Sequence, residues 1–512
     1  MLSTMAPSFL STNKLFEYLH FDADLPKALG LTPPPFSSSS TYHQLLYISR
    51  YLQQLECKTV LLESRYVDRD YMEDHSVFYS RSLTGYPNYC RRLHFFNEAK
   101  DAVEAEFVKL LQEAAGDNEP ERALRRKSRA FSARAYLGFC VIKPLEGSPV
   151  GRTVLRPYGP KADDGSLRVF DSTRLYQAHV AGLELTVAGL AFQQQDVGVS
   201  ACATTALWSS LHKAKDLEDV GPATPAQITS LASRFSLPFG RSMPSEGLSV
   251  DQMCQAIRAF ELAPHLLRPR SFQAARPLVY AAIRSGFAPI LIIRRTTATS
   301  ITTAHAVTAT GVKLVEPTRP RFFAPNIWDY SQAMTALYVH DDRVGPYEKA
   351  SVRDADGQLH LLMDEPTSAA DEVTPKEDWT LTHILLPLHG KIRLSFSSLY
   401  NLLLRLTKKI GKRDDVGASI ATEMFILKGP AYLRSLGLRG DSAALPGEIV
   451  KQLPLSRYVA VIRFRFSSDV TDVLIDTTST EKNLHFLAVV TTSKASALAS
   501  DLAQWCGCPL VM

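Results

Sequence analysis

The stretch from Gln193 to Leu211, QQQDVGVSACATTALWSSL, decides how the rest of the chain is interpreted. Three glutamines and a short loop precede Cys202, and the residues that follow it have a helical period that begins at Ala203. A thiolate on the first turn of a helix is favoured by the helix dipole and by the unpaired N–H groups there. A glutamine upstream can offer its amide as an oxyanion donor. Taken alone, the stretch fits a nucleophile or a buried structural cysteine, because a free cysteine behaves as a small hydrophobe.

The length and composition limit the class of protein. A chain of 512 residues is too long for one core and predicts about three domains. The hydrophobic content of 45% and the charged content of 21% are typical of a globular protein. No apolar run of about 18 residues predicts a membrane span, and the N-terminus does not have the pattern of a secretory signal. A net charge of +5 gives no reason to expect nucleic-acid binding.

Cysteine usage and the missing motifs narrow the chemistry. Seven cysteines, an odd number spread over the chain, argue against a disulfide framework and predict a cytoplasmic protein. The pair Cys506 and Cys508 has no His/Cys cluster near it in the sequence, so a structural role is favoured over a metal or redox site. The sequence contains no HExxH, no GxxxxGK[ST] and no GxGxxG before a helix. We therefore expect no metal and no cofactor.

The order of helical and extended patterns predicts three regions. An N-terminal α/β region with a flexible Pro/Ser-rich arm occupies residues 1–135, the middle domain 136–390, and a C-terminal α/β domain 391–512. The middle domain begins with a strand at Tyr136–Ile142 and a β-rich unit that leads into the nucleophile stretch. In the C-terminal domain, the pattern predicts a helix at Ser419–Leu427.

Two helix starts follow the cysteine helix. Thr224 is placed as an N-cap, with Pro225 at the first helical position and Gln227 at the capping-box position. Ser249 is placed as the cap of a further helix.

A histidine and a pair of acids complete the chemistry expected in the middle domain. His305 lies in a β-branched strand, Thr302–Val315, and the strand Ala336–Asp342 (ALYVHDD) ends in two carboxylates. A thiol nucleophile needs a base within hydrogen-bond reach, and that base needs a third group to fix its tautomer. The segment Pro317–Gln332, between these strands, has no clear period and is expected to be an inserted loop.

These elements and their order are similar to the papain-like cysteine peptidases, and most similar to the group containing the double-glycine leader peptidases of bacteriocin exporters. The similarity covers about residues 192–342. It is carried by a Gln before ACATTALWSSL, the Gly247–Ser249 helix start, SGFAPILII, AHAVTATGVK and YVHDD. The resemblance implies an α+β fold, in which a papain-like core of a helical half and an antiparallel sheet is flanked by the N-terminal and C-terminal α/β regions.

The resemblance also implies roles for four residues. Cys202 would be the nucleophile and His305 the general base. Asp341 would orient the histidine, and Gln195 would lend its amide to the oxyanion hole.

Three departures from the family pattern leave alternatives open. The usual spacing from Gln to Cys is one residue shorter than here, so Gln194 or Asp196 can also occupy the oxyanion position. Ala203 replaces the usual Gly after the nucleophile. The long interval between the histidine and the acid leaves Asp342 and, more weakly, Asn326 as alternatives for the third group. His340, on the opposite side of its strand from Asp341, is expected to be structural.

The sequence therefore predicts a cysteine hydrolase, and most specifically a peptidase that cleaves a peptide or isopeptide bond through an acyl-enzyme. An acyltransferase or amidase would use the same triad, and a papain-like module without catalysis is a further alternative, because fold similarity alone does not establish activity. The expected partner is a protein or peptide substrate. A further protein contact is expected through the large N- or C-terminal regions.

Overall fold

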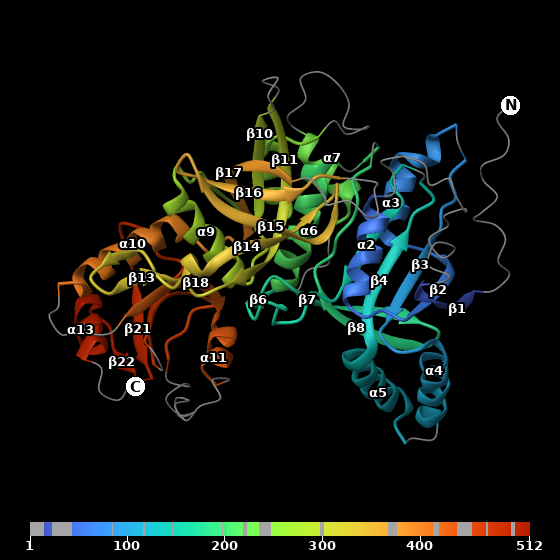
Figure 1. Ribbon diagram of the computed structural model, residues 1–512, viewed down its shortest axis with the longest axis horizontal. Helices are drawn as coiled ribbons and strands as arrows, with labels where there is room; N and C mark the ends of the chain where they lie inside the picture. The colour runs from blue at the N-terminus through green and yellow to red at the C-terminus, as the bar shows by residue number, and fades with distance from the viewer. Residues whose placement is uncertain are drawn as a thin grey trace.

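The computed structural model of the chain describes residues 15–22, 43–83, 85–115, 118–145, 147–196, 198–199, 201–218, 223–234, 247–296, 302–366, 376–412, 419–437, 453–466, 469–492 and 497–511. Three large sheets with helices packed on them make the fold mixed α+β. Figure 1 shows the N-terminal sheet on the right, a barrel in the middle and the C-terminal sheet on the left. The Pro/Ser-rich arm expected at residues 32–42 lies outside the described residues.

The N-terminal unit is a five-stranded antiparallel sheet in the order β1-β2-β3-β4-β5. Its strands are β1 (Phe16–His20), β2 (Thr59–Tyr66), β3 (Cys90–Phe96), β4 (Tyr136–Ile142) and β5 (Val150–Leu155). Its helices are α2 (His43–Gln54), α3 (Arg69–Val77), the short η3 (Tyr79–Arg81), α4 (Lys100–Ala115) and α5 (Pro120–Ala135). Alternate residues of the strands point to opposite faces, so α2 packs on one face and α4 and α5 pack on the other.

The boundary expected after residue 135 is wrong, because it cuts this sheet. The strand expected at Tyr136–Ile142 forms with these bounds as β4, but it pairs with β3 and β5 of the N-terminal unit. No linker separates α5 from β4, since one ends at Ala135 and the other begins at Tyr136. The β-rich unit expected before Cys202 is a separate hairpin of β7 (Arg174–Val180) and β8 (Leu183–Gly189).

A closed six-stranded antiparallel barrel forms the centre of the molecule. It closes because β10 pairs with β11 on one side and with β17 on the other. Its strands are β10 (Ile290–Thr296), β11 (Thr302–Leu314), β14 (Met334–Asp341), β15 (Gly345–Ala355), β16 (Gln358–Asp364) and β17 (Lys376–Leu388), with β6 (Leu167–Val169) and β9 (Ala263–Leu267) paired at its margins.

Four helices accompany the barrel, and the helix that begins at Cys202 is the most enclosed of them. They are α6 (Cys202–Leu217), α7 (Pro225–Ser233), α8 (Val250–Ala259) and α9 (Phe272–Arg284). Helix α6 is buried from Ala203 to Ala214, because it lies between the barrel strands β11 and β17 and the helices α7 and α8. The two expected helix starts are confirmed: Thr224 and Ser249 each close a capping box.

The C-terminal unit is a seven-stranded sheet in the order β12-β13-β18-β19-β20-β21-β22. Its strands are β12 (Phe322–Ala324), β13 (Ile327–Asp329), β18 (Ile420–Lys428), β19 (Tyr458–Arg465), β20 (Val470–Asp476), β21 (Phe486–Thr491) and β22 (Leu510–Val511). Its helices are α10 (Phe396–Ile410), α11 (Gly429–Gly437) and α13 (Ala497–Cys506), and the short η4 (Tyr330–Ala333) follows β13.

Two expectations in this part of the chain are wrong. The helix expected at Ser419–Leu427 is strand β18, which pairs with β13 on one side and β19 on the other. Burial of Ile420 through Ile426 between neighbouring strands outweighs the helix propensity of Ala, Glu, Met and Leu in this segment. The inserted loop expected at Pro317–Gln332 contains β12 and β13, and it adds these strands to the C-terminal sheet.

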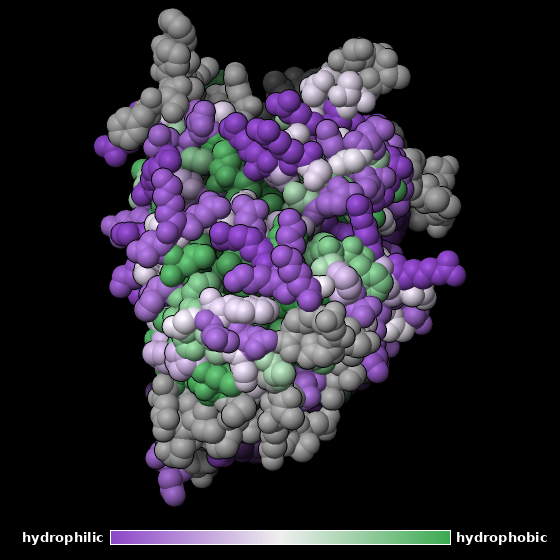
Figure 2. Space-filling view, turned by 90° about the vertical axis from the view of Figure 1, so that its left-hand side faces the viewer, coloured by the Kyte–Doolittle hydropathy of each residue, from purple (hydrophilic) through white to green (hydrophobic). Residues whose placement is uncertain are grey.

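The side of the molecule formed by the C-terminal unit is mostly polar, with separate apolar areas among the charged side chains (Figure 2). Two aromatic side chains of β12, at the edge of the sheet, are among the exposed large apolar groups: Phe322 is 47% exposed and Phe323 36%. The protein contact expected through this region stays a prediction. Within the described ranges, the chain forms no helix long and apolar enough to cross a membrane.

Candidate active site

Cys202 is the first residue of α6. The helix has Ala201 as its N-cap, with extended backbone, and the Thr205 N–H donates to the Ala201 carbonyl at 3.0 Å. The cysteine is a free thiol and is partly exposed, while the next residue, Ala203, is buried. The sulfur therefore lies at the end of a helix where the first N–H groups have no partner within the helix. This is the placement expected from the sequence.

The segment before Cys202 is attached to the edge of the N-terminal sheet. Phe192 exchanges backbone hydrogen bonds with Thr153 of β5, at 2.8 Å in each direction. The Gln194 N–H donates to the Val150 carbonyl at 3.0 Å, and the Gln194 side-chain oxygen accepts from the Val150 N–H at 3.3 Å. The N-terminal unit therefore fixes the direction from which the chain approaches Cys202.

Asp196 shapes the turn that follows. Its Oδ1 accepts from the N–H groups of Gly198, at 2.9 Å, and Val199, at 2.6 Å, and its Oδ2 lies 3.5 Å from Lys143 Nζ. A Cβ added at Gly198 would lie 2.6 Å from the ring of Phe78, so only glycine fits there. These contacts commit the Asp196 carboxylate to the loop rather than to an oxyanion.

The glutamines of the loop have different surroundings. The Gln194 amide is bonded to β5 and its neighbouring turn, with Nε2 at 3.5 Å from the Gly147 carbonyl. Gln195 is exposed, and its oxyanion role stays a prediction. Gln193 is only 4% exposed, and among the described residues its buried Nε2 has no hydrogen-bond partner. The Gln193 amide was not among the candidates predicted from the sequence. Its burial distinguishes it from Gln195, and burial becomes visible only in the structure.

His305 is brought to Asp341 by the register of two barrel strands. Thr308 on β11 pairs with His340 on β14, so His305 and Asp341 are close to diagonal neighbours on one face. His305 Nε2 lies 2.9 Å from Asp341 Oδ1 and 3.7 Å from Asp342 Oδ1. The structure thus favours Asp341 over Asp342 as the partner of the histidine.

The imidazole also contacts the sulfur. The Cys202 thiol forms a side-chain hydrogen bond with His305. Burial lowers the pKa of this histidine, but the charge and hydrogen bond of Asp341, the Cys202 bond and the charge of Asp342 outweigh it and raise the pKa to about 10. A ring with this pKa is positively charged at neutral pH.

Asp341 is fully buried and held by several donors. Its Oδ1 accepts from the Arg343 backbone N–H at 2.9 Å, and its Oδ2 accepts from the Arg343 guanidinium at 2.7 Å. Burial would raise the pKa of this carboxyl, but the charges and hydrogen bonds of His305 and Arg343 hold the pKa below its usual range. An ionised carboxylate only accepts hydrogen bonds, so His305 Nε2 carries the proton and Nδ1 is the nitrogen left for the thiol.

Three residues around the pair were not expected from the sequence. Arg343 lies with its guanidinium 5.0 Å from the centre of the Trp379 ring, and that ring lies 5.7 Å from the His305 ring. Glu377 accepts from Arg343 at 2.9 Å and from the Trp379 indole N–H at 3.0 Å. Trp379 is 2% exposed and covers the His305–Asp341 pair. Arg343 had a weak signal in the sequence, because it directly follows the two acids.

The other candidates for the third group lie elsewhere or have other partners. Asn326 is in the turn between β12 and β13, where its carbonyl accepts from the Ile420 N–H of the C-terminal sheet. His340 is structural, as expected: its Nδ1 accepts from the Tyr347 N–H at 3.2 Å, and its Nε2 lies 3.1 Å from the Leu190 carbonyl.

His305, Asp341 and Asp342 also offer three ligand atoms within 4.8 Å of one another, a spacing that a metal ion could use. However, the guanidinium of Arg343 donates to both oxygens of Asp341. A fixed cation bonded to the central ligand opposes a second cation at the same place. The donor set therefore suits a protonated histidine better than a metal ion.

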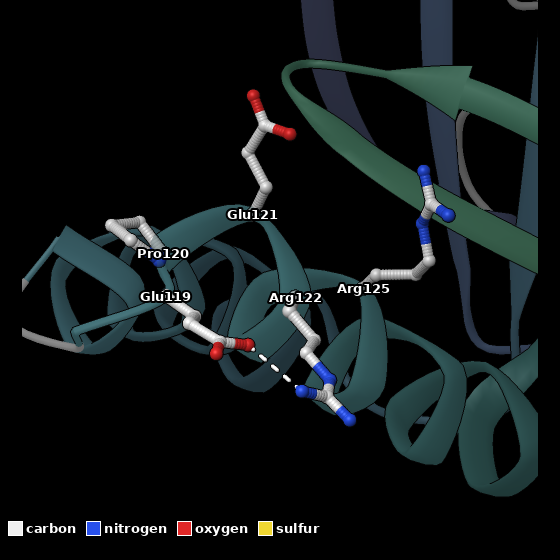
Figure 3. A pocket seen from close by; sticks show the side chains of 5 residues that line it. All are labelled: Glu119, Pro120, Glu121, Arg122 and Arg125. Carbon is white, nitrogen blue, oxygen red and sulfur yellow. Dashed lines mark hydrogen bonds and ion pairs between the residues drawn. The ribbon is translucent and has the colours of Figure 1, made fainter.

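A hollow at the start of α5 is separate from this site. It has a volume of about 700 Å³ and is lined by Glu119, Pro120, Glu121, Arg122 and Arg125. Figure 3 shows that the Glu119 carboxylate turns toward Arg122, with which it forms a 3.0 Å bond, while Glu121 and Arg125 point away from that pair. The hollow shares no residue with the Cys202 site, and we assign it no part in the chemistry.

A scan of protein-family models finds no match to this chain, and a search of curated proteins likewise finds none.

Proposed function

We propose that this protein is a cysteine hydrolase, specifically a peptidase that cleaves a peptide or isopeptide bond, and that α6 to α8 with the barrel form a papain-like core. The observation that supports this most strongly is the chain of contacts Cys202–His305–Asp341, which begins at a helix N-terminus. A structural cysteine has no need of a charged histidine beside it. The buried ring of Trp379 lies 5.7 Å from the ring of His305 and helps to hold it.

The proposed reaction has two steps. The Cys202 thiolate attacks the scissile carbonyl, and the oxyanion is held by the Cys202 N–H and a glutamine amide, for which Gln195 is proposed. His305 then gives its proton to the leaving amine as the C–N bond breaks, which leaves a thioester. In the second step His305 takes a proton from water, the resulting hydroxide attacks the thioester, and the acid product leaves as the thiolate is restored. Asp341 holds the ring in place throughout.

The proposal is tested by single-site alkylation and by a search for new protein N-termini. Iodoacetamide should modify Cys202 rapidly at pH 7 in the wild type and slowly in the His305→Ala variant. Proteomes incubated with wild type should contain N-termini that are missing after incubation with Cys202→Ala. Slow alkylation that does not change in His305→Ala would contradict the enzyme, and turnover only in the presence of an amine acceptor would replace the peptidase with an acyltransferase.

The oxyanion donor is tested in the same assay. Gln195→Ala should lower kcat by about 10²- to 10³-fold if this side chain donates to the oxyanion. Gln193→Ala is the matched variant, because its buried Nε2 is the other amide near the loop with a hydrogen available. A loss in Gln193→Ala alone would transfer the role to Gln193.

A further inference from the structure

Helix α2 of the N-terminal unit touches the turn that carries the acid of the site. Gln44 Nε2 donates to the backbone carbonyl of Asp342 at 3.0 Å, across 298 positions of sequence. Gln44 is 5% exposed, so this hydrogen bond is shielded from water. If this amide lost its acceptor, the protein would be destabilised by the desolvation cost of an unpaired polar group. The contact therefore favours the arrangement in which Gln44 faces the Asp342 carbonyl.

The same helix encloses the rest of the turn. Gly345 lies against the ring of Tyr47 so closely that an added Cβ would be 2.2 Å from a ring carbon. One helical turn further along, the ring of Tyr51 stacks at 5.7 Å on that of Tyr347, and its hydroxyl donates to the Arg156 carbonyl at 2.8 Å. The turn between β14 and β15 is therefore packed from outside by α2, and its backbone cannot shift without moving that helix.

The hydrogen bond from Gln44 acts on the same peptide unit that donates to Asp341. The Asp342 carbonyl and the Arg343 N–H belong to one peptide unit, which is planar with its C=O and N–H pointing in opposite directions. The carbonyl accepts from Gln44, and the N–H donates to Asp341 Oδ1 at 2.9 Å. When Gln44 fixes the direction of the C=O bond, it also fixes the direction of the N–H bond, which points the opposite way within the same plane. Hydrogen bonds connected in this way polarise one another.

The chain of contacts continues to the sulfur. Asp341 Oδ1 is also the acceptor for His305 Nε2 at 2.9 Å, and His305 is bonded to the Cys202 thiol. Asp341 thus has its orientation set from two directions, by the Arg343 side chain and by the peptide unit that Gln44 holds.

We propose that Gln44 is a positioning residue for the triad, and that the N-terminal unit, which attaches the loop before Cys202 through β5, also sets the acid through α2. The inference rests on the proposed function for its catalytic meaning. It makes the region outside the papain-like core a part of the active centre rather than an appended domain.

The test compares two glutamines of one helix. Gln44→Leu removes the donor with little change in volume, and Gln53→Leu, at an exposed position of α2, is the matched control. Gln44→Leu should lower kcat about tenfold, the effect of one hydrogen bond, with KM within about twofold of wild type. In histidine-labelled protein, the pKa of His305 measured by NMR should fall by about one unit in Gln44→Leu and stay unchanged in Gln53→Leu.

The titration separates this inference from the function on which it rests. The pKa of His305 reports on its pairing with Asp341 whether or not the protein cleaves a substrate. The measurement therefore tests the role of Gln44 even if no Cys202-dependent cleavage is found. Gln44→Met is the second variant, for use if Gln44→Leu does not fold: its thioether cannot donate to the Asp342 carbonyl, and the same fall in the pKa of His305 is expected. A His305 titration that is the same in wild type, Gln53→Leu and the folded Gln44 variants would overturn the proposal.

Discussion

Two buried histidines lie on neighbouring strands of the barrel, and their surroundings differ. His305 on β11 is 5% exposed and His340 on β14 is 4% exposed, so burial does not distinguish them. His340 is bonded to a backbone N–H and a backbone carbonyl, of Tyr347 and Leu190, which suit the neutral ring. His305 faces an ionised carboxylate, that of Asp341.

The titration of the two rings follows from these partners. Burial lowers the pKa of His340 to about 3, and its bond to the Leu190 carbonyl offsets only part of that effect. At His305 the same effect of burial is outweighed by Asp341, Cys202 and Asp342, and the pKa rises to about 10. The barrel buries both rings, and only the carboxylate at the end of β14 makes one of the two histidines a charged neighbour of a thiol.

The largest change at His305 is expected when the charge of Asp341 is removed. In Asp341→Asn the amide can still accept a hydrogen bond, but the closest opposite charge is lost, and the Asp342 carboxylate at 3.7 Å offsets less of the burial of a charged His305. We expect the pKa of His305 to fall and the rate of Cys202 alkylation at pH 7 to drop by about 10²- to 10⁴-fold. The rate is measured by mass spectrometry of the labelled peptide. A variant that keeps more than one third of the wild-type rate would show that Asp341 is dispensable.

The two histidines should also give the protein opposite responses to pH. The pKa of His305 is raised when folded, so its stabilisation is fully present below about pH 6.5 and is lost as the pH rises toward about 10. The pKa of His340 is lowered when folded, so stability is lost as the pH falls from about 6.5 toward about 3. Each effect should amount to a few kcal/mol over its full range.

Differences between variants isolate these contributions from other titrating groups. The unfolding free energy of wild type and of His305→Gln, measured in urea between pH 6 and pH 9.5, should converge as the pH rises. The corresponding pair with His340→Gln should converge as the pH falls from 7 to 4. Parallel curves in either series would contradict the charge state assigned to that histidine.

A smaller effect is expected from the arginine that holds the acid. Arg343→Gln removes the guanidinium that donates to both oxygens of Asp341, keeps the backbone N–H that donates to Oδ1, and leaves Glu377 with less opposite charge. We expect Cys202 alkylation to slow by about tenfold and the free energy of unfolding to fall by about 2 kcal/mol. Arg353→Gln is the control, because Arg353 pairs with Asp378 at the surface. Equal effects of the two substitutions on alkylation would remove Arg343 from the site.

The places of Cys202, His305 and Asp341 within their elements could be predicted from the sequence, and the reason is local. Cys202 begins a helix whose apolar period is visible, and His305 lies in a β-branched strand. Asp341 is the last residue of β14, the strand that pairs with the strand of His305. Each of these residues is marked by its own segment, so the three placements needed no knowledge of distant contacts. The choice between Asp341 and Asp342 does require knowledge of distant contacts, because the two residues are adjacent and their distances to His305 depend on the turn that follows β14.

The errors came from pairings between distant segments. Strand β18 contains good helix formers and becomes a strand because β13, about 90 residues earlier, and β19 lie on either side of it. The N-terminal boundary was misplaced because β4 completes a sheet begun by β1. Gln44 lies in an ordinary amphipathic helix, and its contact with Asp342 has no trace in either local sequence. Local periodicity carries no information about such contacts, so they require the structure.

The smallest effect on the reactivity of Cys202 is expected from a substitution of His340. His340→Leu leaves the Tyr347 N–H and the Leu190 carbonyl without their partner, so the free energy of unfolding should fall by roughly 2 kcal/mol. Cys202 alkylation should stay within about twofold of wild type, because the His305–Asp341 pair keeps its own donors and acceptors. Thermal unfolding and the alkylation rate are measured on the same preparation. If alkylation slowed along with the loss of stability, the two histidines would form one coupled unit, and the division between a structural and a reactive ring would fail.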